Sequence, residues 1–177
     1  MSKLYVNDIY SKTGATEAIN IDNSGRVIMP QRPMFKVYRT ANINYGTADV
    51  DVKMTGWDDD TSAGAVNVNN FWDTTNDKAV IPVTGMYMFE LKGFKGTGTY
   101  GQIWLIMKVN GGQAKGADFR LNRSNSGFGW EGVNFNAHLY LDEGDYVEFY
   151  FNSATGNAYF HPSSGNIYSG ICAHLVG

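Results

Sequence analysis

The sequence is poor in cysteine and proline, with one Cys and four Pro among 177 residues. A single cysteine excludes a disulfide within the chain and a zinc site built from several thiolates. Lys and Arg number 14 against 17 Asp and Glu, so no positive excess is available to neutralise nucleic-acid phosphates. No apolar run approaches the roughly 20 residues that span a bilayer. We therefore expect neither nucleic-acid binding nor membrane insertion.

The start of the chain, Met1-Ser2-Lys3-Leu4, lacks the apolar core of a signal peptide. If the protein works outside a cell, we expect it to leave by a route other than secretion. Helical periodicity is missing as well, because no segment sustains apolar residues at positions i, i+3, i+4 and i+7. Glycine is abundant, with 21 residues, and aromatic residues make up 14% of the chain. This composition predicts an all-β protein with many tight turns.

After Pro33, alternating apolar residues predict a series of antiparallel strands. Asn110-Gly111, between two such runs, is the strongest short signal for a hairpin. The stretch before Gly64 is polar and gives no readable strand pattern. The strands are expected at 34–38, 65–71, 78–83, 86–91, 103–109, 117–121, 133–141, 147–151 and 167–176, with 65–71 paired to 78–83 across a turn at 73–77. So many antiparallel strands in one domain predict a two-sheet jelly roll.

Residues 1–32 differ from the rest, because their short apolar clusters cannot close a core of their own. Met29-Pro30-Gln31-Arg32-Pro33 then interrupts regular structure twice and marks a boundary. We interpret residues 1–32 as an N-terminal attachment or stem segment that packs with copies of itself or with a larger assembly. Residues 33–177 are then the head. The alternative for residues 1–32 is a tail lying loosely on the head.

Several stretches of the head resemble the globular head of complement one-q. Residues 67–71 (NVNNF) precede 78–89 (KAVIPVTGMYMF), and the similarity continues through 103–111, 139–147 and 168–172. The resemblance spans nearly all of residues 33–177. It implies the tumour-necrosis-factor-like jelly roll and a tight homotrimer.

The first region resembles a second family. Residues 3–9 (KLYVNDI) and 21–30 (IDNSGRVIMP) are similar to the N-terminal repeats of bacteriophage tail-fibre proteins, which often carry such heads. A collagen-like glycine repeat, as found in complement proteins, is absent from the sequence. The resemblance therefore implies a viral setting, with the protein made in the host cytoplasm and located in the virion.

The sequence carries few signals for catalysis or for a cofactor. The glycine-rich stretch 93–98 (GFKGTG) lacks the Gly-Lys-Ser/Thr of a phosphate-binding loop. Four glutamates lie scattered without the paired arrangement that glycoside hydrolysis needs: Glu90, Glu131, Glu143 and Glu148. We therefore expect a protein that is not an enzyme and that needs no cofactor.

Metal ligands are equally sparse. The histidines His138, His161 and His174 lack the spacing of a metal site, and Cys172 is expected to be a buried, inert thiol. Asp58-Asp59-Asp60, near two further aspartates, is the best candidate for a cation site, although a solvated acidic loop is the preferred interpretation.

Two runs point directly to self-association. Residues 86–89 and 104–107 are apolar on both faces of their strands, whereas an antiparallel sheet that faces water shows one polar face. The second face must meet a partner, and Tyr140 is expected to contribute to it. We predict a homotrimer.

Successive loops of an antiparallel sheet alternate between its two ends. The loops at 94–100, 123–130 and 153–165 should lie at the end farthest from residues 1–32, with the turns at 110–112 and 142–145 at the near end. The far loops carry aromatic side chains beside asparagines, a combination suited to sugars because rings cover the apolar face of a pyranose. The expected ligand-binding residues are Phe94, Tyr100, Phe128, Trp130, Tyr159, Phe160 and His161.

Together these observations predict a trimeric virion fibre or tail-tip protein. Its head would bind a host-surface glycan or protein, and residues 1–32 would join it to a virion or fibre assembly. The alternative is a purely structural virion component, such as a plug, collar or decoration, that binds no ligand.

Overall fold

The computed structural model describes residues 8–10, 17–39, 43–45, 48–60, 64–95, 102–122, 131–154, 158–161 and 169–176. These residues form strands and turns, with one short 3-10 helix at Val68–Asn70. The strands make two sheets that face each other and a separate small sheet of three strands. No helix in the described part of the chain is long and apolar enough to cross a membrane.

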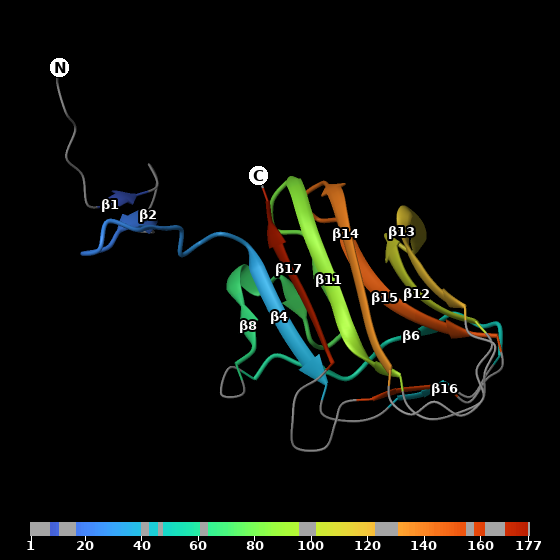
Figure 1. Ribbon diagram of the computed structural model, residues 1–177. Helices are drawn as coiled ribbons and strands as arrows, with labels where there is room; N and C mark the ends of the chain where they lie inside the picture. The colour runs from blue at the N-terminus through green and yellow to red at the C-terminus, as the bar shows by residue number, and fades with distance from the viewer. Residues whose placement is uncertain are drawn as a thin grey trace.

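The first sheet is built on four strands that lie side by side: β4 (Met34–Arg39), β17 (Gly170–Leu175), β11 (Gly85–Lys95) and β14 (Glu131–Leu141) (Figure 1). Shorter strands extend its margins. These are β5 (Ile43–Tyr45), β7 (Trp57–Asp58), β8 (Val66–Asn67) and β16 (Ala158–His161). We call this sheet I.

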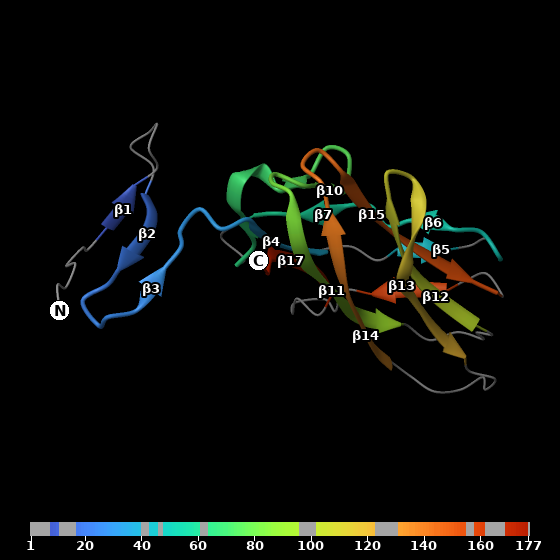
Figure 2. The ribbon, with the colours of Figure 1, turned by 90° about the horizontal axis from the view of Figure 1, so that it is seen from above.

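The second sheet, sheet II, runs in the order β13 (Gly112–Asn122), β12 (Gln102–Val109), β15 (Tyr146–Ser153), β10 (Lys78–Val80) and β9 (Trp72–Asp73), with β6 (Val52–Lys53) paired to β15. The small sheet consists of β1 (Asp8–Tyr10), β2 (Glu17–Ile21) and β3 (Val27–Ile28). Figure 2 shows these three strands beside the head, and we call residues 8–28 the arm.

The core lies between sheets I and II, because alternate residues of each strand point toward the other sheet. In β15 every second residue is buried, and its Phe149 ring lies 6.2 Å from that of Phe89 in sheet I. Phe35 of β4 meets Phe71 edge-on, with the ring centroids 4.8 Å apart. The alternation predicted for the long strands is thus confirmed.

The two ends of the head differ. Tyr87 near the start of β11 pairs with Leu175 at the end of β17, and Gly85 pairs with Leu141 at the end of β14. The turn at 142–145 therefore lies beside the chain's C-terminal strand end, and Asn110 Nδ2 donates to Asp145 Oδ1 at 2.7 Å, which places the 110–111 turn there too. We call this end the base and the opposite end the tip. The predicted placement of these two turns at the same end is confirmed.

The predicted hairpin at Asn110-Gly111 is also confirmed. Both residues have positive φ, 50° and 79°, as the turn favoured between twisted antiparallel strands requires. The returning strand β13 begins at Gly112, earlier than the expected residue 117, because the tight turn allows pairing to resume at once.

The predicted pairing of 65–71 with 78–83 is wrong for most of its length. Val66 and Asn67 pair with Lys36 and Phe35 of sheet I. Only at its end does the prediction hold, where the Val80 N–H donates to the Phe71 carbonyl at 2.8 Å and Trp72–Asp73 pairs with β10 in sheet II. Between them Asn69 and Asn70 adopt left-handed conformations, with φ of 61° and 52°, which redirects the chain from one sheet to the other. The polar stretch without a strand pattern contains three short strands, β5, β6 and β7.

Candidate functional site

The outer face of sheet I, which points away from the core, is the main candidate surface. Strand pairing aligns its side chains in rows across β4, β17, β11 and β14. One row holds Met34, His174, Met88 and His138, in that order, because directly paired residues project to the same side of a sheet.

Hydrophobic side chains gather at the base end of this face. Met86 pairs directly with Tyr140, and the N–H of Val176, directly after β17, donates to the Met86 carbonyl at 2.7 Å. Four large hydrophobic residues here are exposed: Met34 at 41%, Met86 at 36%, Tyr140 at 67% and Val176 at 45%. We call these four residues the base patch. Exposed apolar side chains gathered on one surface are typical of a protein interface.

Toward the tip the same face becomes polar. The next row holds Lys36, Cys172, Glu90 and Asn136. The Cys172 thiol is half-buried rather than fully buried as predicted, since it lies on the outer face, where its Sγ donates a weak hydrogen bond to Glu90 Oε2 at 3.6 Å. Burial, and then the nearby Glu90 carboxylate, raise the pKa of the Cys172 thiol. The thiol is therefore protonated and slow to react at neutral pH.

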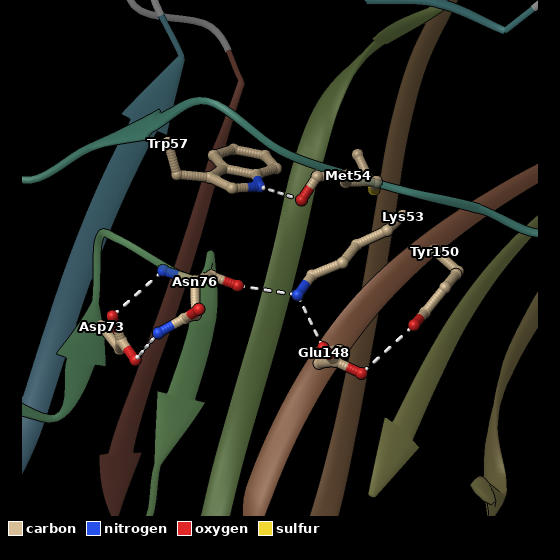
Figure 3. A network of polar contacts seen from close by, with 7 residues as sticks. All are labelled: Lys53, Met54, Trp57, Asp73, Asn76, Glu148 and Tyr150. Carbon is tan, nitrogen blue, oxygen red and sulfur yellow. Dashed lines mark hydrogen bonds and ion pairs between the residues drawn. The ribbon is translucent and has the colours of Figure 1, made fainter. Parts of the chain in front are cut away.

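On the outer face of sheet II, several charged and polar side chains of the described residues pair with one another. Lys53 Nζ lies 2.6 Å from Glu148 Oε1 and donates to the Asn76 carbonyl at 2.7 Å (Figure 3). The Tyr150 hydroxyl donates to Glu148 Oε2 at 3.1 Å. Lys108 Nζ lies 4.1 Å from the centroid of the Tyr150 ring. Burial, and then the Glu148 charge, raise the pKa of Tyr150 to about 12.

The prediction that residues 104–107 need a partner on their second face is wrong. Ile106 is only 8% exposed and Trp104 is half-buried within a single chain, so this face needs no second copy. On the run 86–89 the outcome differs, because Met86 stays exposed.

The predicted ligand-binding residues fall in two groups. Phe94 lies in β11 and Tyr159, Phe160 and His161 lie in β16, so these four are in strands rather than in the expected loops. The strand register pairs Phe94 with His161, Lys95 with Phe160 and Tyr159 with Asn44. Tyr100, Phe128 and Trp130 lie outside the described residues. The backbone thus brings four of the seven positions to the tip end of sheet I.

The acidic stretch at 58–60 forms local hydrogen bonds. Asp58 Oδ1 accepts from the Asp60 N–H at 2.8 Å, and Asp59 Oδ2 accepts from Asn67 Nδ2 at 3.0 Å. Within the described ranges, no three His, Cys, Asp or Glu side chains lie together as metal ligands would. The two hydrogen bonds tie residues 58–60 to one another and to Asn67 of β8.

No protein-family model matches this sequence, and no curated protein matches it. Solved structures share its fold. The structure of Eiger TNF from S. frugiperda matches with a TM-score of 0.60 at 11% identity, covering 82% of this chain and 94% of that one. The globular domain of zebrafish complement 1qA protein matches with a TM-score of 0.53 at 16% identity, covering 82% and 98%. The head is therefore a two-sheet antiparallel jelly roll of the tumour necrosis factor type, as predicted.

Proposed function

We propose that the chain is the subunit of a homotrimer that presents a ligand-binding head. The base patch carries this proposal, because it leaves large apolar side chains in water on a sheet whose other face already forms the core. Removing apolar surface from water contributes about 25 cal/mol per Å² of favourable free energy, so contact between copies through the base patch would stabilise their association. The jelly-roll fold and the resemblance of residues 67–89 to the complement one-q head favour three copies.

The test is the mass of the full chain in solution. Met86→Lys combined with Tyr140→Glu places charges in the base patch and should convert a trimer into single chains by size-exclusion chromatography with light scattering. Val50→Lys is the matched control, since Val50 is 46% exposed but lies outside the patch. If the double variant kept the parent mass, the base patch would not be the interface.

The tip is the proposed ligand-binding end. The strand register places Phe94 beside His161 there, at the end opposite the base patch and the arm. The proposed ligand is a host-surface glycan or protein, recognised by the aromatic residues of the tip segments. Trp130→Ala with Tyr159→Ala should abolish binding to host cells or to a glycan array while the trimer and its melting temperature are kept.

The setting we propose is a bacteriophage virion, as a tail-fibre or tail-tip protein attached through residues 1–32. This rests on the similarity of residues 3–9 and 21–30 to tail-fibre repeats. We propose binding without catalysis, and no cofactor. Unchanged host binding in the Trp130 and Tyr159 double variant would favour the second candidate, a structural plug, collar or decoration.

A further inference from the structure

The arm carries an apolar face whose side chains are mostly exposed. Ile9 pairs directly with Ile19, and Ile21 pairs directly with Val27. Ile19 and Ile21 are two residues apart on β2, so all four side chains lie on one side of the small sheet. Ile9, Ile21 and Val27 are exposed, and Ile19 is half-buried. We call these four residues the arm face.

A tight turn fixes which residues form this face. Asp22 Oδ1 accepts hydrogen bonds from the N–H groups of Ser24 at 2.8 Å and Arg26 at 2.9 Å. Arg26 Nε also donates to Asp22 Oδ2 at 2.6 Å, and Gly25 supplies the positive φ of 77°. A slip of one residue would move Val27 to the other side of the sheet, so this turn holds the arm face together.

The arm is also tied to the base of the head. Arg32 Nε donates to the Leu175 carbonyl at 2.6 Å, and Arg32 Nη2 donates to the Val176 carbonyl at 2.8 Å. The Leu175 N–H donates in turn to the Pro33 carbonyl at 3.0 Å. The arm therefore leaves the head beside Val176, which belongs to the base patch.

The exposed apolar residues gather in one part of the molecule. Among the described residues, all large hydrophobic side chains that are exposed, except Val50, lie on the arm, at Met29 directly after it, or at the base end of the head. In Figures 1 and 2 the small sheet stands beside the head, joined to it by residues 29–33. Burial of the exposed side chains of Ile9, Ile21 and Val27 against another surface would stabilise this small sheet.

We infer that the arm face binds the arm faces of the other copies, which makes the arm a second self-association surface. This inference rests on the proposed homotrimer. The four side chains of the arm face are all aliphatic, so an apolar partner suits them. The symmetric copies of the base patch bring the attachment points of the arms together, and the same surface on each copy then supplies that partner.

The experiment uses the full chain with Cys172→Ser and Ser24→Cys, so that a bifunctional maleimide can join only arms. We expect cross-linked chains on a denaturing gel. Ile21→Lys should abolish them, and Val27→Thr, which keeps a β-branched side chain, should reduce them several-fold. Ile28→Lys is the matched control, because Ile28 is 43% exposed against 39% for Ile21 but lies on the opposite side of the small sheet.

Light scattering on the same samples separates the two proposals. A trimer mass in all variants, with cross-links lost in Ile21→Lys and kept in Ile28→Lys, supports the inference. A trimer mass with cross-links retained in Ile21→Lys, or lost equally in Ile28→Lys, overturns the inference and leaves the proposed function standing. A single-chain mass for the parent overturns both.

Discussion

The outer faces of the two sheets differ in how far the side chains of the same chain cover their apolar residues. On sheet II, Lys53, Glu148 and Tyr150 satisfy one another, and Ile106 is buried beside them. On sheet I, Met86 and Tyr140 remain in water. Both faces come from strands of similar alternation, so apolar content alone does not identify an interface. What distinguishes them is whether the same chain already covers the apolar side chains.

The largest effect should separate the two sides of β11. Phe89 is fully buried in the core, so Phe89→Ala should lower the free energy of unfolding by about 3–5 kcal/mol. Met88, on the outer face, should matter to association instead. Urea unfolding of each variant in the background of Met86→Lys with Tyr140→Glu measures the single chain. Equal losses for Phe89→Ala and Met88→Ala would contradict the assignment of faces.

The second effect compares one glutamate on each outer face. Glu148→Ala leaves Lys53 Nζ and the Tyr150 hydroxyl without their carboxylate and should cost about 1–3 kcal/mol. Glu90 is half-buried and has weaker partners, the exposed Lys92 at 4.0 Å and the Cys172 thiol at 3.6 Å, so Glu90→Ala should change stability by less than about 1 kcal/mol. Chemical denaturation at neutral pH gives both values. A larger loss for Glu90→Ala would reverse the comparison.

The third effect depends on pH. The pKa of Tyr150 is raised to about 12 from 10, so its contribution to stability is complete below pH 10. It is lost as the pH rises toward 12, because the unfolded chain then loses the proton first. Tyr150→Phe should remove part of the fall in the urea midpoint between pH 10 and 12, while burial of Tyr87, which raises its pKa, supplies another part.

The control for that experiment is Val50→Thr, a neutral change at an exposed position outside the base patch that removes no phenol. It should leave the alkaline fall as in the parent. An identical pH profile for Tyr150→Phe and the parent would show that the Tyr150 network does not hold the neutral phenol.

The smallest effect concerns the reactivity of Cys172. Its raised pKa and half-buried position should make reaction with a maleimide slow at neutral pH. In Met86→Lys with Tyr140→Glu the outer face of sheet I is uncovered, and the rate should rise several-fold. Val50→Lys should react at the parent rate. A faster reaction in the Val50 variant than in the double variant would argue against a covered face.

The long strands could be predicted from the sequence because apolar residues that become buried alternate with polar residues along them, as Val133, Phe135 and Ala137 do. The strands β5, β6 and β7 could not, since two or three residues are too few to show a period. The switch of Val66–Asn67 to sheet I was missed for the same reason, although Asn69-Asn70 is a sequence signal for left-handed backbone.

Only part of the candidate surface on sheet I could be predicted from the sequence. The apolar run 86–89 and Tyr140 could be identified from the sequence, but Met34 and Val176 join them only through the register of β4, β17 and β11. The run 104–107 looked equivalent, and only the folded chain shows that Lys108 and Tyr150 lie together on that face. Sequence alternation reports which residues share a face, but not what covers it.

The most direct test of the central claim is the solution mass of the full chain at micromolar concentration. We predict a mass three times the 19.6 kDa of one chain, falling to 19.6 kDa when Met86→Lys and Tyr140→Glu are combined. A parent protein that runs as a single 19.6 kDa species would contradict it.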